Sequence, residues 1–85
     1  MLAVEIYSKK DCPWCEKAKK LFDNLSIDYK EFVLNEDYTK QELQEKVPGA
    51  KTVPQIFINN KHIGGFSELT TYLEESISNY AHDIT

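Results

Sequence analysis

The chain has 85 residues, the length of one domain, and residues 1–85 are therefore predicted to form a single domain. An apolar content of 41% with 12% aromatic residues is typical of a globular protein and excludes a disordered chain. Ten lysines, no arginine and fourteen acidic residues give a net charge of −4, which argues against a nucleic-acid-binding protein because that class carries a basic surface.

Charge is spread unevenly along the chain. Residues 9–20 hold five lysines against Asp11 and Glu16, a local excess of +3, whereas residues 28–45 hold two lysines against six acids, a local excess of −4. One end of the molecule is therefore predicted to attract an anionic ligand.

The first six residues have neither the basic flank nor the apolar run of a signal peptide. No stretch approaches the ~18 consecutive apolar residues of a membrane helix. We therefore expect a cytoplasmic location and no membrane association. Because cytoplasmic thiols are kept reduced, the two cysteines are expected to serve redox chemistry rather than to form a structural disulfide.

Strand and helix patterns alternate in the first part of the chain. Residues 2–7 are short, apolar and compatible with a strand, and a polar loop follows them. Residues 28–34 are predicted to form a second strand. Between the two strands, Pro13 suits the first position of a helix, and a helix over 13–25 is predicted from the helical spacing of Ala18, Leu21, Phe22 and Leu25.

A second, shorter helix is predicted over residues 40–47. Thr39 and Glu42 have the spacing of a capping box, in which each residue satisfies a free N–H group at the start of a helix. Pro48 cannot continue the helix, and Gly49 tolerates the left-handed conformation that ends many helices.

The last part of the chain is predicted to form a hairpin and a long helix. Residues 55–58 and 61–63 flank Asn59-Asn60, a pair that accepts the positive φ angles of a two-residue turn. Gly64-Gly65 then interrupts the chain, and Ser67 is the predicted N-cap of the final helix. Five apolar residues mark one face of that helix: Phe66, Leu69, Leu73, Ile77 and Tyr80.

The predicted order of elements is therefore βαβαββα. A strand, a crossover helix and a second strand imply a parallel pair, and the hairpin adds an antiparallel pair. The fold class is α/β, with a four-stranded mixed sheet flanked by three helices that cover both of its faces.

The segment Cys12-Pro13-Trp14-Cys15 carries the strongest chemical signal. Cys12 lies where the loop after the first strand becomes a helix, and the free N–H groups of a helix start stabilise a thiolate. A zinc site needs four ligands, and the cysteines with His62 and His82 lack zinc-binding spacing, so no metal is expected and both histidines are interpreted as surface residues. The pair is predicted to carry out thiol–disulfide exchange, with an inert pair as the alternative.

Four blocks of sequence together resemble the dithiol glutaredoxins of the thioredoxin superfamily, of the small bacterial or phage type. They are IYSK before CPWC, Gln41, TVPQIFI at 52–58 and HIGGFSEL at 62–69, and the resemblance covers residues 3–80. It implies a thioredoxin-like fold and a glutathione-dependent thiol–disulfide oxidoreductase that reduces glutathione mixed disulfides and protein disulfides.

The same resemblance assigns the site residues. Cys12 and Cys15 are implied to be catalytic, Cys12 as the nucleophile and Cys15 as the resolving thiol. The implied glutathione-binding residues are Lys9, Trp14, Gln41, Thr52, Val53, Pro54, Gly65, Phe66, Ser67 and Glu68.

Within this set, Lys9 and Gln41 are implied to meet the glycyl carboxylate of glutathione. Pro54 is implied to follow a cis bond, which leaves the backbone N–H and C=O of Val53 free to pair with glutathione. Gly64-Gly65 brings backbone N–H groups to the γ-glutamyl carboxylate.

Two positions depart from the family pattern, and one assignment is left open. Phe66 stands where many relatives have a cysteine, and Trp14 stands where Tyr or Phe is usual. The α-amino group of glutathione is implied to contact the side chain of either Ser67 or Glu68.

The implied partners are glutathione, glutathionylated proteins and protein disulfides, with ribonucleotide reductase as one protein client. A monomer is expected, and no tightly bound cofactor is implied beyond glutathione as a co-substrate. Two alternatives are a thioredoxin-like hydrogen donor reduced by a flavin enzyme and a glutaredoxin that bridges an iron–sulfur cluster. The stiffness that Pro13 gives the active-site loop argues against the cluster.

Overall fold

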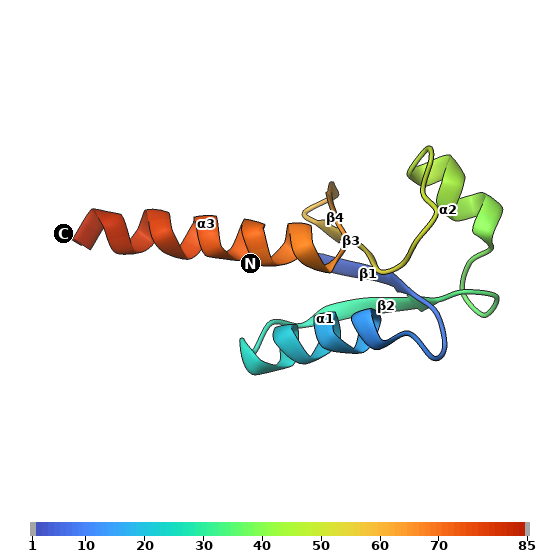
Figure 1. The fold of residues 1–85 in the computed structure, drawn as a ribbon, viewed down its shortest axis with the longest axis horizontal. Coiled ribbons are helices and arrows are strands. Elements are labelled where there is room, and N and C mark those ends of the chain that lie inside the picture. Colours follow the sequence, from blue (N-terminus) through green and yellow to red (C-terminus); the bar gives the residue numbers. More distant parts are fainter. Residues whose placement is uncertain (1, 85) are drawn as a thin grey trace.

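The computed structural model describes the backbone of residues 2–84 and the surroundings of the side chains of residues 2–75 (Figure 1). The predicted order βαβαββα is confirmed. The elements are β1 (Val4–Ser8), α1 (Pro13–Asn24), β2 (Tyr29–Val33), α2 (Lys40–Lys46), β3 (Gln55–Ile58), β4 (Lys61–Gly64) and α3 (Phe66–Ile84). None of the described helices is both long enough and apolar enough to cross a membrane.

The four strands form one mixed sheet in the order β2-β1-β3-β4. The central strand β1 is parallel to β2 and antiparallel to β3, and β3 is antiparallel to β4. The parallel pair follows from α1, which returns the chain to the edge at which β1 began. All four residues of β3 are buried, as expected of a strand covered on both faces.

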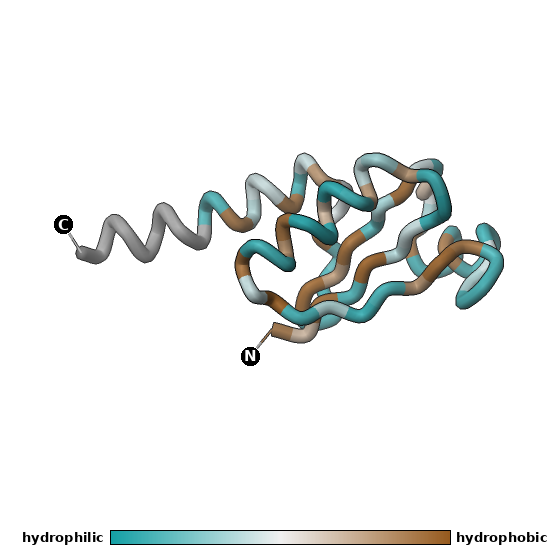
Figure 2. Tube along the Cα trace, turned by 90° about the horizontal axis from the view of Figure 1, so that it is seen from below, coloured by the Kyte–Doolittle hydropathy of each residue, from teal (hydrophilic) through white to brown (hydrophobic). Residues whose placement is uncertain are grey.

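Helices cover both faces of the sheet, as predicted. On one face, α1 and α3 pack against alternate strand residues in a cluster that includes Ile6, Phe22, Ile56 and Leu69. The intervening residues of the same strands point to the other face, where a second cluster under α2 contains Tyr7, Tyr38, Leu43, Ala50 and Phe57. Figure 2 shows hydrophobic segments along the strands and at intervals along the helices, where they alternate with hydrophilic ones.

The turn signals in the sequence are confirmed. Thr39 and Glu42 form a complete capping box at the start of α2, with Thr39 N–H donating to Glu42 at 2.9 Å and Glu42 N–H donating to Thr39 at 3.1 Å. Gly49 has φ +83, and both residues of the β3–β4 turn have positive φ, +53 at Asn59 and +67 at Asn60. These are the left-handed conformations that glycine and asparagine tolerate.

Several predicted boundaries were wrong by one or two residues. β1 begins at Val4 and includes Ser8, so Leu2 lies outside the sheet and is 40% exposed. α1 ends at Asn24, and the predicted core residue Leu25 is instead an exposed C-cap residue. Both leucines follow the apolar pattern, yet each lies just outside its element and is exposed.

The prediction for the start of the last helix also needs correction. α3 begins at Phe66, which places Ser67 inside the first turn and not at the N-cap. Gly65 precedes the helix, and its N–H group donates to the carboxylate of Glu68 at 2.7 Å, so a side chain of the first turn satisfies a backbone donor at this end. The predicted core residues Ile77 and Tyr80 and the predicted surface residue His82 lie outside the described side chains.

Candidate active site

Cys12 is the N-cap residue of α1, as its place in the sequence indicates. The loop after β1 turns at Asp11, which has φ +55, and Cys12 then has an extended backbone before Pro13 opens the helix. The backbone N–H of Cys15 donates to Sγ of Cys12 at 3.2 Å. A sulfur atom at this position accepts a hydrogen bond from the helix start and lies at its positive end, and both effects favour a thiolate.

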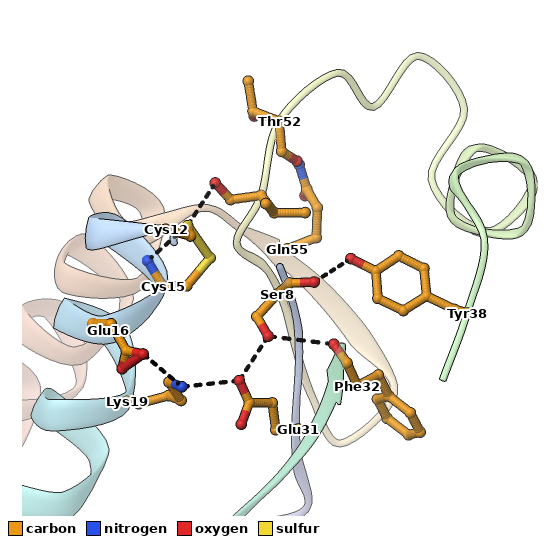
Figure 3. Close-up of a disulfide and its surroundings, with 11 residues drawn as sticks. Ser8, Cys12, Cys15, Glu16, Lys19, Glu31, Phe32, Tyr38, Thr52 and Gln55 are labelled. Carbon is orange, nitrogen blue, oxygen red and sulfur yellow. Dashed lines mark hydrogen bonds and ion pairs between the residues drawn. A yellow bond between two sulfur atoms is a disulfide. The ribbon is translucent and has the colours of Figure 1, made fainter. Parts of the chain in front are cut away.

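The two cysteines form a disulfide (Figure 3). Their Cα atoms are 5.2 Å apart, within the range that a disulfide spans without backbone movement. Cys12 is 6% exposed and Cys15 is 1% exposed. Because an attacking or attacked sulfur needs a route to solvent, this difference makes Cys12 the outer thiol of the pair and Cys15 the inner one.

The loop before β3 runs beside this disulfide, and the peptide bond between Val53 and Pro54 is cis, as the resemblance implied. The carbonyl oxygen of Val53 lies 3.8 Å from Sγ of Cys12. Within the described part of the chain, no backbone hydrogen bond joins either the N–H or the C=O of Val53 to another backbone group. The backbone N–H and C=O of Val53 therefore lie next to the Cys12 sulfur, where they can pair with the backbone of an extended peptide.

A pocket of about 340 Å³ opens beside Val53. Three of the predicted site residues line it, namely Lys9, Thr52 and Val53. Two further lysines, Lys40 and Lys51, also line it and were missed from the sequence, because neither belongs to a recognisable motif. The remaining lining residues form a mostly apolar wall: Leu34, Tyr38, Leu43 and Ala50.

Gln41, which the resemblance assigns to the same end of glutathione as Lys9, does not line this pocket. It is exposed on α2 and is not among the lining residues, whereas its neighbour Lys40 is. A helix rotates successive side chains by about 100°, so two adjacent residues face different directions.

The start of α3 lies on the opposite side of the disulfide from the pocket. The ring of Phe66 is half-buried, and its centroid is 5.6 Å from that of Trp14, which is 54% exposed. Lys17 places its ammonium group 4.2 Å from the Trp14 ring centroid, a cation–π contact. Trp14 and Phe66, both predicted site residues, thus form a second surface beside the two cysteines.

The glycines before α3 lie close to Glu68, whose carboxylate is held by Gly65. Gly64 has φ +124, and a Cβ atom there would lie 2.8 Å from Cγ of Glu68. At Gly65, a Cβ atom would lie 3.5 Å from the carbonyl oxygen of Pro54, so the two backbone segments run near each other. Ser67 is exposed and makes no such contact with the glycines.

A charged network that the sequence did not indicate lies on the α1 side of the sheet near the disulfide (Figure 3). The buried hydroxyl of Ser8 donates to Glu31 at 2.6 Å, and Lys19 contacts Glu31 at 3.0 Å and Glu16 at 3.1 Å. Burial, the largest single influence, raises the pKa of Glu31, but the bonds from Ser8 and Lys19 outweigh it and leave that pKa below its ordinary value. Burial lowers the pKa of Lys19, but Glu31 and Glu16 outweigh it and leave that pKa raised.

Tyr38 also contacts Ser8, the last residue of β1. Its hydroxyl donates to the carbonyl oxygen of Ser8 at 2.6 Å, although the two residues are 30 positions apart. Burial, with a smaller contribution from Tyr7, raises the pKa of Tyr38 to about 12. The hydroxyl therefore stays protonated and fixes the residue from which the Cys12 loop departs.

The surface interpretation of His62 is confirmed, since its side chain is exposed on β4. Its ring nitrogen Nε2 lies 2.7 Å from the side-chain oxygen of Gln55, a partner that the spacing did not suggest. Gln55 in turn donates to the carbonyl oxygen of Thr52 at 3.0 Å, so the histidine supports the loop beside the thiols. Among the described residues, no group of three or more His, Cys, Asp or Glu side chains is arranged to hold a metal ion.

Comparison with known proteins places this geometry among the glutaredoxins. A family model described as Glutaredoxin matches residues 4–63. The chain is 42% identical over 69 residues to Glutaredoxin 3 of Escherichia coli strain K12, and the aligned part covers 81% of this chain and 83% of that protein.

Two solved structures show the same fold. Glutaredoxin 1 from Francisella tularensis, complexed with cacodylate, superposes with a TM-score of 0.77 at 30% identity and covers 92% of this chain and 99% of its own. The buckwheat glutaredoxin–glutathione complex also has a TM-score of 0.77 at 30% identity, over 88% of this chain and 71% of its own.

Proposed function

Because this chain belongs to the glutaredoxin family and is a thiol–disulfide oxidoreductase, we propose that glutathione is its reductant and that its substrates are glutathione mixed disulfides and protein disulfides. The observation that carries the proposal is the position of Cys12. Its sulfur accepts the N–H of Cys15 at 3.2 Å and lies 3.8 Å from the carbonyl oxygen of Val53, with which no backbone N–H of the described residues pairs. An activated sulfur thus lies beside a backbone edge that fits a short peptide.

With a glutathione mixed disulfide, the Cys12 thiolate attacks the glutathione sulfur. A bond forms between Cys12 and glutathione, and the protein thiolate leaves and takes up a proton. A second glutathione thiolate then attacks the glutathione sulfur held on Cys12, which releases oxidised glutathione and restores the Cys12 thiolate. Each cycle consumes one free glutathione, and the glutathione that leaves the substrate forms the other half of the oxidised glutathione.

With a protein disulfide, Cys12 forms the mixed disulfide and Cys15 resolves it. The attack of Cys15 on the Cys12 sulfur releases the reduced protein and leaves the Cys12–Cys15 disulfide, the state present in this structure. Two glutathione molecules then reduce that disulfide. Cys15 is tethered beside Cys12, which gives it a large effective concentration over any free thiol.

The proposed orientation of glutathione follows from the charges around the disulfide. Its cysteine pairs with the backbone of Val53, next to Thr52 and Pro54. Its glycyl carboxylate lies toward Lys9, which lines the adjacent pocket, and Gln41 is assigned to the same end.

The γ-glutamyl end then lies on the other side of the disulfide, toward the start of α3. The N–H groups of Phe66 and Ser67, in the first turn of the helix, suit its carboxylate. We assign the α-amino group to Glu68, because its carboxylate is the acidic group beside Gly65, where it already accepts a hydrogen bond at 2.7 Å. Trp14 and Phe66 flank the thiols as an apolar contact for substrates.

A coupled assay with glutathione, glutathione reductase and a glutathionylated peptide tests the proposal. We expect Cys12→Ser to abolish all turnover, and we expect Cys15→Ser to retain reduction of the glutathione mixed disulfide but to lose reduction of a peptide disulfide. Mass spectrometry of Cys15→Ser should find glutathione on Cys12.

Two results would contradict this function. One is wild-type turnover with a thioredoxin reductase in place of glutathione, which is the hydrogen-donor alternative. The other is retained activity in Cys12→Ser, which would assign the nucleophile to a different residue.

A further inference from the structure

The pocket beside Val53 is more cationic than glutathione requires. Lys9, Lys40 and Lys51 line it, and the described residues that line it include no acid. None of these three lysines is within ion-pair distance of a described carboxylate, unlike Lys10 and Lys19. Three lysines therefore line one pocket without a counter-charge among the described residues.

Glutathione supplies one carboxylate to this end of the site. Lys9 is three residues before Cys12, and Lys51 directly precedes the Thr52-Val53 edge, so both lie where the chain already meets glutathione. Lys40 comes from α2, on the far side of the pocket, and no group of glutathione is assigned to it. The charge of Lys40 is therefore available to a ligand that extends beyond the position of the glutathione glycine.

A protein client supplies such an extension. In glutathione the glycine follows the cysteine, so a client whose cysteine occupies the same place directs the residues after that cysteine into the pocket. Each further residue of an extended chain advances about 3.3 Å. The apolar wall of Leu34, Tyr38 and Leu43 suits the body of such a segment, and the lysines suit its acidic side chains.

We propose that this pocket binds the segment that follows the reactive cysteine of a protein disulfide, that it favours acidic residues there, and that Lys40 is the specificity-determining residue. The inference rests on the proposed function for the orientation of the client. The chemistry is the dithiol exchange already described: Cys12 and Cys15 lose two electrons and the client disulfide gains them.

The test uses the full chain, reduced beforehand and freed of reductant, in single turnover against three symmetrical peptide disulfides. Their monomers are Cys-Gly-Glu-Glu, Cys-Gly-Gln-Gln and Cys-Gly-Lys-Lys, each blocked at both ends. We expect the wild type to reduce the acidic disulfide about threefold to tenfold faster than the neutral one at low salt, the range of one or two exposed ion pairs. Raising the salt concentration to about 0.5 M should shrink this ratio by screening.

Lys40→Gln should lower the ratio of acidic to neutral rates, and Lys40→Arg should keep it, which separates a charge effect from a disturbed fold. Lys20→Gln is the matched control, because Lys20 is exposed on α1 and does not line the pocket, and it should leave the ratio unchanged. A wild-type ratio near one, or an equal ratio in Lys40→Gln and wild type, would overturn the proposal. Since single turnover needs no glutathione, failure of glutathione turnover in the coupled assay would reject the proposed function separately.

Discussion

The Ser8–Glu31–Lys19 network makes a prediction about stability that depends on pH. Glu31→Gln keeps the size and shape of the side chain but removes its charge. The hydroxyl of Ser8, which is 1% exposed, then donates to a neutral group in place of a carboxylate. Lys19 loses one partner but keeps Glu16 at 3.1 Å, so no charge is left buried alone.

The expected cost follows from these contacts. A hydrogen bond to a charged group contributes about 1 kcal/mol more than one between neutral groups. The ion pair adds at most ~1 kcal/mol, because 19% of the Lys19 side chain and 28% of the Glu31 side chain remain exposed. We therefore expect Glu31→Gln to lower the free energy of unfolding by about 1–2 kcal/mol at pH 7.

The pH dependence has a definite sign. The folded state lowers the pKa of Glu31, so its contribution is complete above the ordinary carboxyl pKa of the unfolded chain, ~4.3, and is lost as pH falls through the lower folded value. The raised pKa of Lys19 means that the Lys19 contribution is complete below its unfolded value of ~10.4 and is lost only above it. The difference between wild type and variant should therefore be constant from about pH 5 to pH 9 and shrink toward pH 3.

Urea denaturation of the disulfide form, followed by far-ultraviolet circular dichroism at pH 7 and pH 3, measures this difference. With a slope of about 1 kcal/mol per molar urea for so small a protein, the midpoint should fall by roughly 1–2 M at pH 7. Glu45→Gln is the control, because Glu45 is exposed on α2 and forms no hydrogen bond or ion pair with a described residue. A loss of stability that is equal at both pH values, or no larger than that of the control, would refute the reasoning.

Three further predictions concern the site and its supports. Lys9→Ala should weaken glutathione use in the coupled assay and shift the thiolate absorbance of the reduced protein to higher pH, whereas Lys20→Ala should do neither; equal effects of the two variants would remove the proposed role of Lys9. Gly64→Ala should destabilise the fold by about 1–2 kcal/mol in urea denaturation, because φ +124 strains any residue with a Cβ, and an unchanged midpoint would contradict this. Thr39→Ala should cost about 1 kcal/mol in the same measurement through loss of the helix cap, while Thr39→Ser should restore most of it; equal losses in both variants would rule out capping as the cause.

The site was predictable where it depends on short motifs. The Cys12–Cys15 spacing with Pro13 identified the helix start, and the structure places Cys12 at the N-cap. Residues 52–54 resemble a segment of the glutaredoxin family, and that resemblance indicated the cis peptide bond before Pro54. Lys40 marks the limit of this approach, because a motif on a helix does not identify the neighbouring residues that line the same pocket.

The sequence by itself determined the order of the elements, the capped start of α2 and the left-handed turns, because each depends on residues within a few positions of one another. The contacts between Ser8 and Glu31, Ser8 and Tyr38, and Gln55 and His62 were decided only by the tertiary structure. In the first, β1 and β2 run parallel with Ser8 in register with Val33, so Glu31, two residues earlier, points to the same face of the sheet. Register and packing set which distant side chains meet, and local periodicity carries no information about either.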